Sequence, residues 1–266
     1  MILASSFFDH VLDTSRWHIF ESIDLGFRLP APLTKFIILE LIAGGLIAFF
    51  YIRLARRVRD GNPPHGWWWN SLEVLLTFIR NEVAKPCIGE HDADRYVPFL
   101  WTMFLFILVN NLLGLIPFMG SATGSFWVTS GLALCAAGVI HGAAVFKHGP
   151  VHYVKSFYPH IDAPGGALIG LFIAGIEVMG HGIKAFVLAV RLYANIFAGH
   201  TVLAVILSFV VMAKNAPFYL FWPIGIGSTL FIVALSFLEL FIAFLQAYVF
   251  VFLTSIFLGM TLHPEH

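Results

Sequence analysis

Charged residues are scarce in this chain: Asp, Glu, Lys and Arg make up 11 % of its 266 residues, against about 25 % in soluble proteins. Hydrophobic residues make up 59 %, and the mean hydropathy is +0.86. Apolar runs of about 20 residues and longer exclude a soluble domain and indicate several membrane-spanning helices. The formal net charge is zero, which gives no electrostatic reason to expect nucleic acid as a partner.

The motifs of several protein classes are also missing. The two cysteines, Cys87 and Cys135, are far apart in the sequence and indicate neither a disulfide framework nor a zinc site. The chain has no GxxxxGKS/T loop and no HExxH motif, and it lacks the internal repeat that many secondary transporters show. Asp9 and Asp13 interrupt the apolar start of the chain, so we expect no cleavable signal peptide.

Five apolar segments are long enough to cross a membrane as helices. These predicted spans are residues 34–54, 96–119, 125–146, 165–213 and 225–261. Residues 67–84 begin with three tryptophans and place apolar residues near helical spacing, which is typical of an amphipathic helix at the membrane interface. The predicted fold is therefore an all-α integral membrane protein, with an outer amphipathic lead-in at 1–33 and a single membrane domain at 34–266.

The last two spans are unusually long. A continuous helix over 165–213 would measure about 70 Å, more than twice a bilayer core of about 30 Å, so it must tilt, bend or extend past the membrane. We expect a turn that contains Pro217 and Pro223 to join it to the helix at 225–261, giving a long inclined helical hairpin. Residues 86–95 are rich in polar side chains and are predicted to form a loop.

The distribution of Lys and Arg predicts the orientation. With the N-terminus outside, nine of these residues lie on the inner side and four on the outer side. The inner set is Arg53, Arg56, Arg57, Arg59, Arg80, Lys85, Arg95, Lys147 and Lys155, and the outer set is Arg16, Arg28, Lys35 and Lys214. Because inner loops carry the excess of positive charge, we expect the N-terminus outside and the C-terminus in the cytoplasm. The expected location is a bacterial plasma membrane, with an organellar inner membrane as the alternative.

Arg191 is a full positive charge inside the long apolar run at 165–213. Arginine at the centre of a bilayer costs roughly 3 kcal/mol on insertion scales and more than 10 in simulations, so its presence there predicts a function. Asn195 follows at i+4, on the same helix face. The other polar residues of interest at membrane depth are Glu177 and His200 in the same run, and Glu239 and Gln246 in the last span.

An antiparallel hairpin determines which of these residues share a depth. The 191/246 pair and the 200/239 pair both have their midpoints in the predicted turn, so we expect Arg191 opposite Gln246 and His200 opposite Glu239. Glu177 lies almost four turns before Arg191 and shares roughly its face, towards the inside. Histidine exchanges protons near neutral pH, whereas arginine stays charged. The hairpin would thus bury a polar seam with titratable groups on both sides of a fixed cation.

The segments RLYANIFAGH and ELFIAFLQAYVF closely resemble subunit a of the membrane sector of F-type ATP synthases, whose fifth helix carries an essential arginine in an R-L-x-x-N-x-x-A-G context. The resemblance extends to GIEVMGHGIKAFVLAVRL, to FLFILVNNLLGLIPF, and to the length and order of spans from about Thr34 onward. It implies the essential stator role for Arg191 and the acidic position of the exit half-channel for Glu177. It also implies that the outer half-channel, through which protons enter, is formed by Asn195, His200, Glu239 and Gln246.

One departure concerns the titratable pair. Some members of that family carry the acid in helix five and the histidine in helix six, whereas here the histidine is His200 and the acid is Glu239. The exchange keeps the chemistry of the pair.

The resemblance also implies the partners. In that family, subunit a faces a rotating ring of c subunits, each with a membrane-buried carboxylate. Protons come in from outside, neutralise a ring carboxylate, ride almost a full turn and leave inside. The other implied partners are a b-subunit peripheral stalk, the remaining ATP synthase subunits, and membrane lipid. The chain itself would be a non-catalytic subunit without a cofactor, and the choice between proton and sodium would lie mostly in the ring.

Simpler interpretations of the polar residues stay open. His200 and Glu239 could form an inert buried ion pair, and Asn195 and Gln246 could be interhelical hydrogen-bonding residues. Glu177 could pair locally with Lys184 or His181. Asn110 and Asn111 either support the outer channel mouth or mark a helix end.

A second class of function is also considered: a self-contained secondary transporter, or an intramembrane metalloenzyme that uses the histidines. Three of these, His148, His152 and His160, fall in a predicted loop. Because they have no supporting ligand spacing, we expect a solvated loop there rather than a metal site.

Overall fold

The structure is a computed structural model of the chain. It describes residues 16–20, 23–28, 35–58, 66–116, 122–151, 153, 166–213 and 217–263. For some residues within the helices and strands, including Glu177 and His200, only the backbone position is described.

Five helices in this part of the chain are long and apolar enough to cross a membrane. They are α2 (Lys35–Val58), α5 (Glu90–Gly114), α6 (Phe126–His148), α8 (Gly166–Ala213) and α9 (Phe218–Leu262). This confirms the predicted helical membrane fold. The tilt of the helices against a bilayer stays a prediction.

Two short strands lie in the segment that is predicted only as an amphipathic lead-in. They are β1 (Arg16–Phe20) and β2 (Ile23–Arg28), and they pair antiparallel with Arg16 opposite Arg28. In the sequences RWHIF and IDLGFR, apolar residues largely alternate with polar or small ones. This two-residue period is the ordinary signal of a strand.

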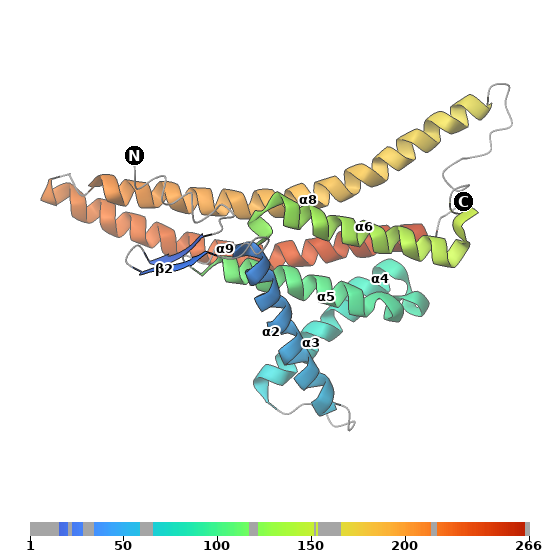
Figure 1. Ribbon diagram of the computed structural model, residues 1–266, viewed down its shortest axis with the longest axis horizontal. Coiled ribbons are helices and arrows are strands. Elements are labelled where there is room, and N and C mark those ends of the chain that lie inside the picture. The colour runs from blue at the N-terminus through green and yellow to red at the C-terminus, as the bar shows by residue number, and fades with distance from the viewer. Residues whose placement is uncertain are drawn as a thin grey trace.

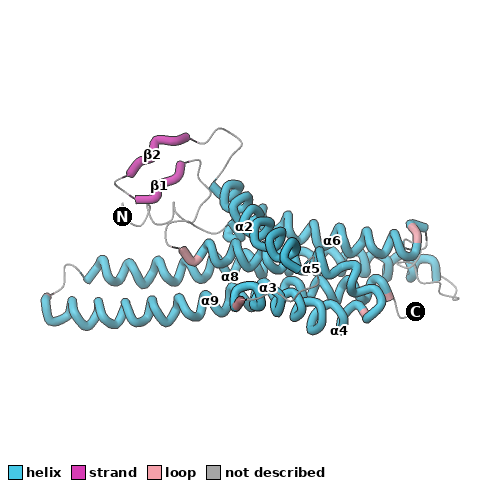
Figure 2. The backbone as a smooth tube through the Cα atoms, turned by 90° about the horizontal axis from the view of Figure 1, so that it is seen from below, coloured by secondary structure: helices cyan, strands magenta, loops and turns pink. Residues whose placement is uncertain are grey.

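Helices α8 and α9 form the long hairpin that their lengths predict. They run side by side from their connected ends, coloured orange and red in Figure 1, and Figure 2 shows the same pairing from a second direction. The start of α8, in yellow, diverges from α9. With 48 residues, α8 is about 72 Å long. The connected ends project past the other helices, and their exposed apolar side chains include Val205, Phe209, Leu230 and Phe231.

The core of the bundle lies where α5 packs on the second half of α9. Leu100 and Phe104 of α5 are buried against this core together with Phe250 and Val251 of α9. Leu192 of α8 belongs to the same cluster and is fully buried. Its burial fixes the rotation of α8 next to Arg191.

Residues 86–95 are helical except at Gly89, so the predicted polar loop is wrong. Gly89 has a φ of 98°, a left-handed conformation that favours glycine, and it ends one helix while the next begins at Glu90. The helix before Gly89 is continuous, with a π-helical stretch in its middle. Its three parts are α3 (Trp67–Phe78), η1 (Ile79–Ala84) and α4 (Lys85–Ile88).

Charge pairs with distant segments explain why these polar residues are helical. Arg80 donates two hydrogen bonds of 2.7 Å to the carboxylate of Asp94, and this raises the pKa of the Arg80 guanidinium. Lys147 of α6 donates to Asp92 at 2.6 Å, and His263 lies 3.3 Å from the same carboxylate. Asp92 is in the first turn of α5, where the helix dipole favours a negative charge. Together these pairs join η1, α5, α6 and the end of α9.

The predicted turn through Pro223 is also wrong. Helix α9 begins at Phe218, directly after Pro217, and holds Pro223 as its sixth residue. A proline there removes one backbone hydrogen bond close to the start of the helix. Membrane helices tolerate such a loss, so α9 starts seven residues earlier than predicted.

Candidate functional site

Arg191 lies near the middle of α8, and its side chain is exposed. Among the described residues, no carboxylate lies within salt-bridge distance of it. Leu188, Ala189 and Leu192 are the buried residues around it. At 100° per residue, Arg191 is about a quarter turn from the centre of that buried stripe. The guanidinium therefore lies at the surface of the chain rather than in its core.

Asn195 is one turn further along α8 and is half-buried. Its Nδ2 atom is buried, and within the described part of the chain it has no hydrogen-bond partner. Leaving a buried donor unsatisfied costs about 1–3 kcal/mol, so such groups are normally paired with protein or water. A water molecule or another polar group is therefore expected beside Asn195, next to Arg191.

Glu239 of α9 lies against the backbone of Gly199 on α8. A Cβ atom added at Gly199 would be 2.6 Å from Oε1 of Glu239. The sequence predicts residues 200 and 239 opposite each other, so the observed register agrees within one residue. Gly199 lies eleven residues after Leu188, or three turns, and hence on the buried face of α8. The absence of a side chain at Gly199 provides the space that the half-buried carboxylate occupies.

Gln246 is buried, with 4 % of its surface exposed. It lies two turns after Glu239 on α9. Within the described part of the chain, no hydrogen bond joins it to Arg191. That these two residues share a depth stays a prediction.

Asn111 of α5 supports this part of α9. From the sequence alone, Asn111 could equally mark the end of a helix. Its side chain is 1 % exposed, and its Nδ2 donates to the carbonyl of Ala243 at 3.2 Å. The Thr123 hydroxyl donates to Oδ1 of Asn111 at 2.7 Å. Ala243 lies between Glu239 and Gln246, so this buried amide fixes α9 at the level of the polar residues.

Two predicted site residues have only a backbone position here. Glu177 and His200 both lie on α8, and their side chains are outside the described part of the chain. Lys184, a proposed partner of Glu177, places its Nζ 5.1 Å from the ring centroid of Phe257 on α9. The predicted His200/Glu239 pair and the local pairing of Glu177 remain predictions.

Of the three histidines in the predicted loop, the structure describes the side chain of His148 alone. The predicted loop position is wrong for His148, which is the last residue of α6 and places its Nε2 3.2 Å from the carbonyl oxygen of Leu262. His160 and the side chain of His152 lie outside the described residues. Within the described ranges, no three His, Cys, Asp or Glu side chains are grouped as metal ligands.

The sequence matches the profile of the ATP synthase A chain family over residues 37–259. ATP synthase subunit a of Chloroherpeton thalassium is 35 % identical over 238 residues, which cover 88 % of this chain and 68 % of that protein. Subunit a of Myxococcus xanthus is 36 % identical over 238 residues, covering 90 % and 75 %. ATP synthase subunit a 2 of Prosthecochloris aestuarii is 31 % identical over 270 residues, covering 97 % and 79 %.

These matches cover the helices that carry Arg191, Asn195, Glu239 and Gln246. They agree with the resemblance seen in the sequence motifs and with the five apolar helices of a multi-pass membrane protein. The chain belongs to the ATP synthase A chain family, whose members include the subunit a proteins of these bacteria.

Proposed function

We propose that this chain is the proton-translocating stator subunit of an ATP synthase membrane sector. It provides two offset half-channels and an essential arginine that faces a rotating ring of c subunits. Proton flow through it is coupled to ATP synthesis, which takes place elsewhere in the complex. Each charge that crosses 100 mV releases about 2.3 kcal/mol, and the ring converts this free energy into torque.

The exposed guanidinium of Arg191 is the observation that carries the proposal. A cation in the middle of a 48-residue apolar helix is costly in lipid, and the described part of this chain supplies no carboxylate to it. A carboxylate on a partner surface would satisfy it. A ring of membrane-buried carboxylates that pass α8 in turn has the required chemistry, and the fixed charge of Arg191 would separate the two half-channels.

The polar residues of α8 and α9 fit an uptake path on the side of the connected helix ends. Glu239 is half-buried beside Gly199, and Gln246 is buried two turns further along. Asn195 has a buried donor that requires a polar partner. With His200 these residues form the proposed outer half-channel, and Glu177 belongs to the proposed exit half-channel near the start of α8.

The exposed apolar surfaces of the hairpin and of α2 suit lipid and partner helices. We assign the ring to the hairpin, where Arg191 is exposed, and include among the partners a b-subunit peripheral stalk. The proposed orientation has the N-terminus outside and the C-terminus in the cytoplasm of a bacterial cell.

Copurification tests the assignment. Isolated from its native membrane in a mild detergent, the chain is expected to copurify with a ring-forming subunit that carries a membrane-buried carboxylate. The measurement is mass spectrometry of the intact complex. Isolation of the chain alone, active as a transporter in proteoliposomes without any ring subunit, would overturn the proposal in favour of a self-contained transporter.

Replacing Glu239 tests the uptake path. Glu239→Gln keeps the shape of the side chain but cannot ionise, so we expect proton-driven ATP synthesis to fall at least about tenfold, because proton-transferring side chains typically contribute 10²–10⁴-fold. Ser236→Ala is the matched control, since Ser236 is an exposed polar residue one turn earlier whose hydroxyl bonds only within α9. Proton flux equal to that of the unmodified complex at every pH from about 6 to 9 would remove Glu239 from the path.

A further inference from the structure

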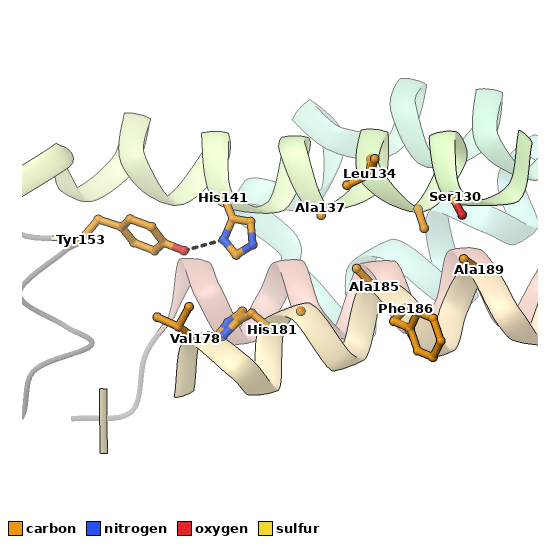
Figure 3. A pocket seen from close by; sticks show the side chains of 12 residues that line it. Ser130, Leu134, Ala137, His141, Tyr153, Val178, His181, Ala185, Phe186 and Ala189 are labelled. Carbon is orange, nitrogen blue, oxygen red and sulfur yellow. Dashed lines mark hydrogen bonds between the residues drawn. The ribbon is translucent and has the colours of Figure 1, made fainter. Parts of the chain in front are cut away.

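A cavity of about 610 Å³ lies between α6 and α8. Its lining on α8 extends from Val178 to Ala189, a length of about 16 Å. Small residues such as Ala137 and Gly182 leave this space open. Ala189 is two residues before Arg191, so the cavity reaches from the first half of α8 to the depth of the guanidinium (Figure 3).

One end of the cavity carries a group of proton-binding side chains. Nδ1 of His141, on α6, lies 2.5 Å from the hydroxyl of Tyr153, and its ring centroid is 5.3 Å from that of His181 on α8. Figure 3 shows the two imidazoles and the phenol together at the end where α6 is close to its C-terminus. The other end is lined by apolar residues and Ser130.

The chain reversal after α6 brings Tyr153 to this position. Gly149 ends α6 with a φ of 82°, which favours glycine, and the backbone N–H of Tyr153 donates to the carbonyl of Gly149 at 3.0 Å. The phenol thereby returns towards His141, twelve residues earlier in the sequence. The three side chains thus come from α6, from the helical residues that follow Gly149, and from α8.

We propose that His141, Tyr153 and His181 form a proton-exchange site at this end of the α6/α8 cavity, which transfers protons between the aqueous phase and the segment of α8 that leads to Arg191. The inference rests on the proposed function and extends it to a helix outside the long hairpin. On α8, Glu177 precedes His181 by one turn, so the site lies beside the residue assigned to the exit half-channel.

The side chains of this site can pass a proton on as readily as they bind it. Imidazole takes up and releases a proton near neutral pH, and either ring nitrogen can carry it. A proton taken up by one imidazole makes both of its ring nitrogens donors, and the hydroxyl of Tyr153 can donate or accept as the proton moves on.

The test uses the complete ATP synthase complex in membrane vesicles. The double variant His141→Gln/His181→Gln keeps hydrogen-bonding side chains but removes both titrating groups. We expect proton-driven ATP synthesis to fall about tenfold and imidazole added to the medium to restore part of the rate. Ser130→Ala, at the apolar end of the same cavity, is the control and should leave the rate unchanged.

Two results would overturn the inference. One is an unchanged rate in the double variant over the pH range from about 6 to 9. The other is a reduced rate that imidazole does not raise, because such a result means that the histidines serve packing alone. Arg191→Ala in the same preparation keeps the two proposals separate: if it abolishes synthesis while the histidine variants do not change it, the exchange site is refuted and the stator function stands.

Discussion

Replacing Arg191 with alanine is expected to abolish proton-driven ATP synthesis while the complex still assembles. The guanidinium is exposed and makes no hydrogen bond or ion pair within the described part of the chain, so its loss should not disturb packing. Removing one member of a buried charge pair costs about 2–5 kcal/mol, and 1.4 kcal/mol corresponds to a factor of ten. A decrease of about 100-fold or more is therefore expected. The measurement is ATP synthesis in vesicles under an imposed proton gradient, together with quantification of the assembled complex.

Two further variants make the result specific to the charge. Val187→Ala truncates an exposed residue one turn earlier on the same face of α8, and it should retain normal synthesis. Arg191→Lys keeps a cation but replaces the planar guanidinium with a compact ammonium that can lose its proton in an apolar site, so we expect an intermediate loss. Coupled synthesis at the normal rate in Arg191→Ala would contradict the stator role.

Removal of the fixed cation should also increase passive proton conductance. In the proposed mechanism, Arg191 keeps the two half-channels from joining, so its absence allows protons to pass without a full rotation of the ring. Proton leak in vesicles without ATP turnover measures this directly. A leak that stays at the level of the unmodified complex would limit the role of Arg191 to binding the ring carboxylate.

The helical framework could be predicted because the determining information is local. Run length and the absence of charge are enough to identify a membrane helix, and all five spans have a corresponding helix. The hairpin register could be estimated for the same reason: two helices joined by a short turn have few ways to align. The position of Glu239 beside Gly199 agrees with the predicted register within one residue.

The errors occur where distant segments decide the local structure. The polar neighbours of Asp92 in the sequence predict a solvent-exposed loop. Its partner Lys147 is 55 residues away in sequence, so the local pattern does not show the pair. The sequence predicts the start of α9 after Pro223 because a single sequence does not show that the helix tolerates the loss of one backbone hydrogen bond. For Asp92, the interactions of the folded protein outweigh local propensity.

The candidate site was predictable only in part for a related reason. Charged and polar residues in an apolar helix are conspicuous, so Arg191, Glu239 and Gln246 could be selected from sequence. Asn111 and His141 could not be assigned, since their roles depend on contacts made across the bundle. Asn111 meets the backbone of α9 132 residues later, and His141 meets Tyr153 only because the chain reverses at Gly149.

The largest expected effect on folding is that of Gly259→Ala, near the end of α9. A Cβ atom at this position would overlap the carbonyl oxygen of Cys87 and would be 3.5 Å from the Cα of Ile88. One turn earlier, the Ser255 hydroxyl donates to the carbonyl of Val83 at 3.3 Å. Ser255 and Gly259 thus form a small-residue pair at i and i+4, the spacing that lets two helix backbones approach closely. Helix α9 packs here directly on the backbone of η1 and α4.

The clash cannot be relieved by a rotamer change, because the atoms it meets belong to the backbone of α4. Overpacking typically costs about 1–3 kcal/mol of folding free energy. For Gly259→Ala we expect a cost of about 3 kcal/mol or more. In a chain of this size, that cost lowers the unfolding midpoint by roughly 6–12 °C. Thermal unfolding in detergent and the yield of folded protein measure it. Gly138→Ala on α6 is the matched control: its Cβ would meet nothing within 4 Å, and alanine is the better helix former by about 1 kcal/mol. The two substitutions should therefore act in opposite directions, and equal midpoints would refute the close approach of α9 to α4.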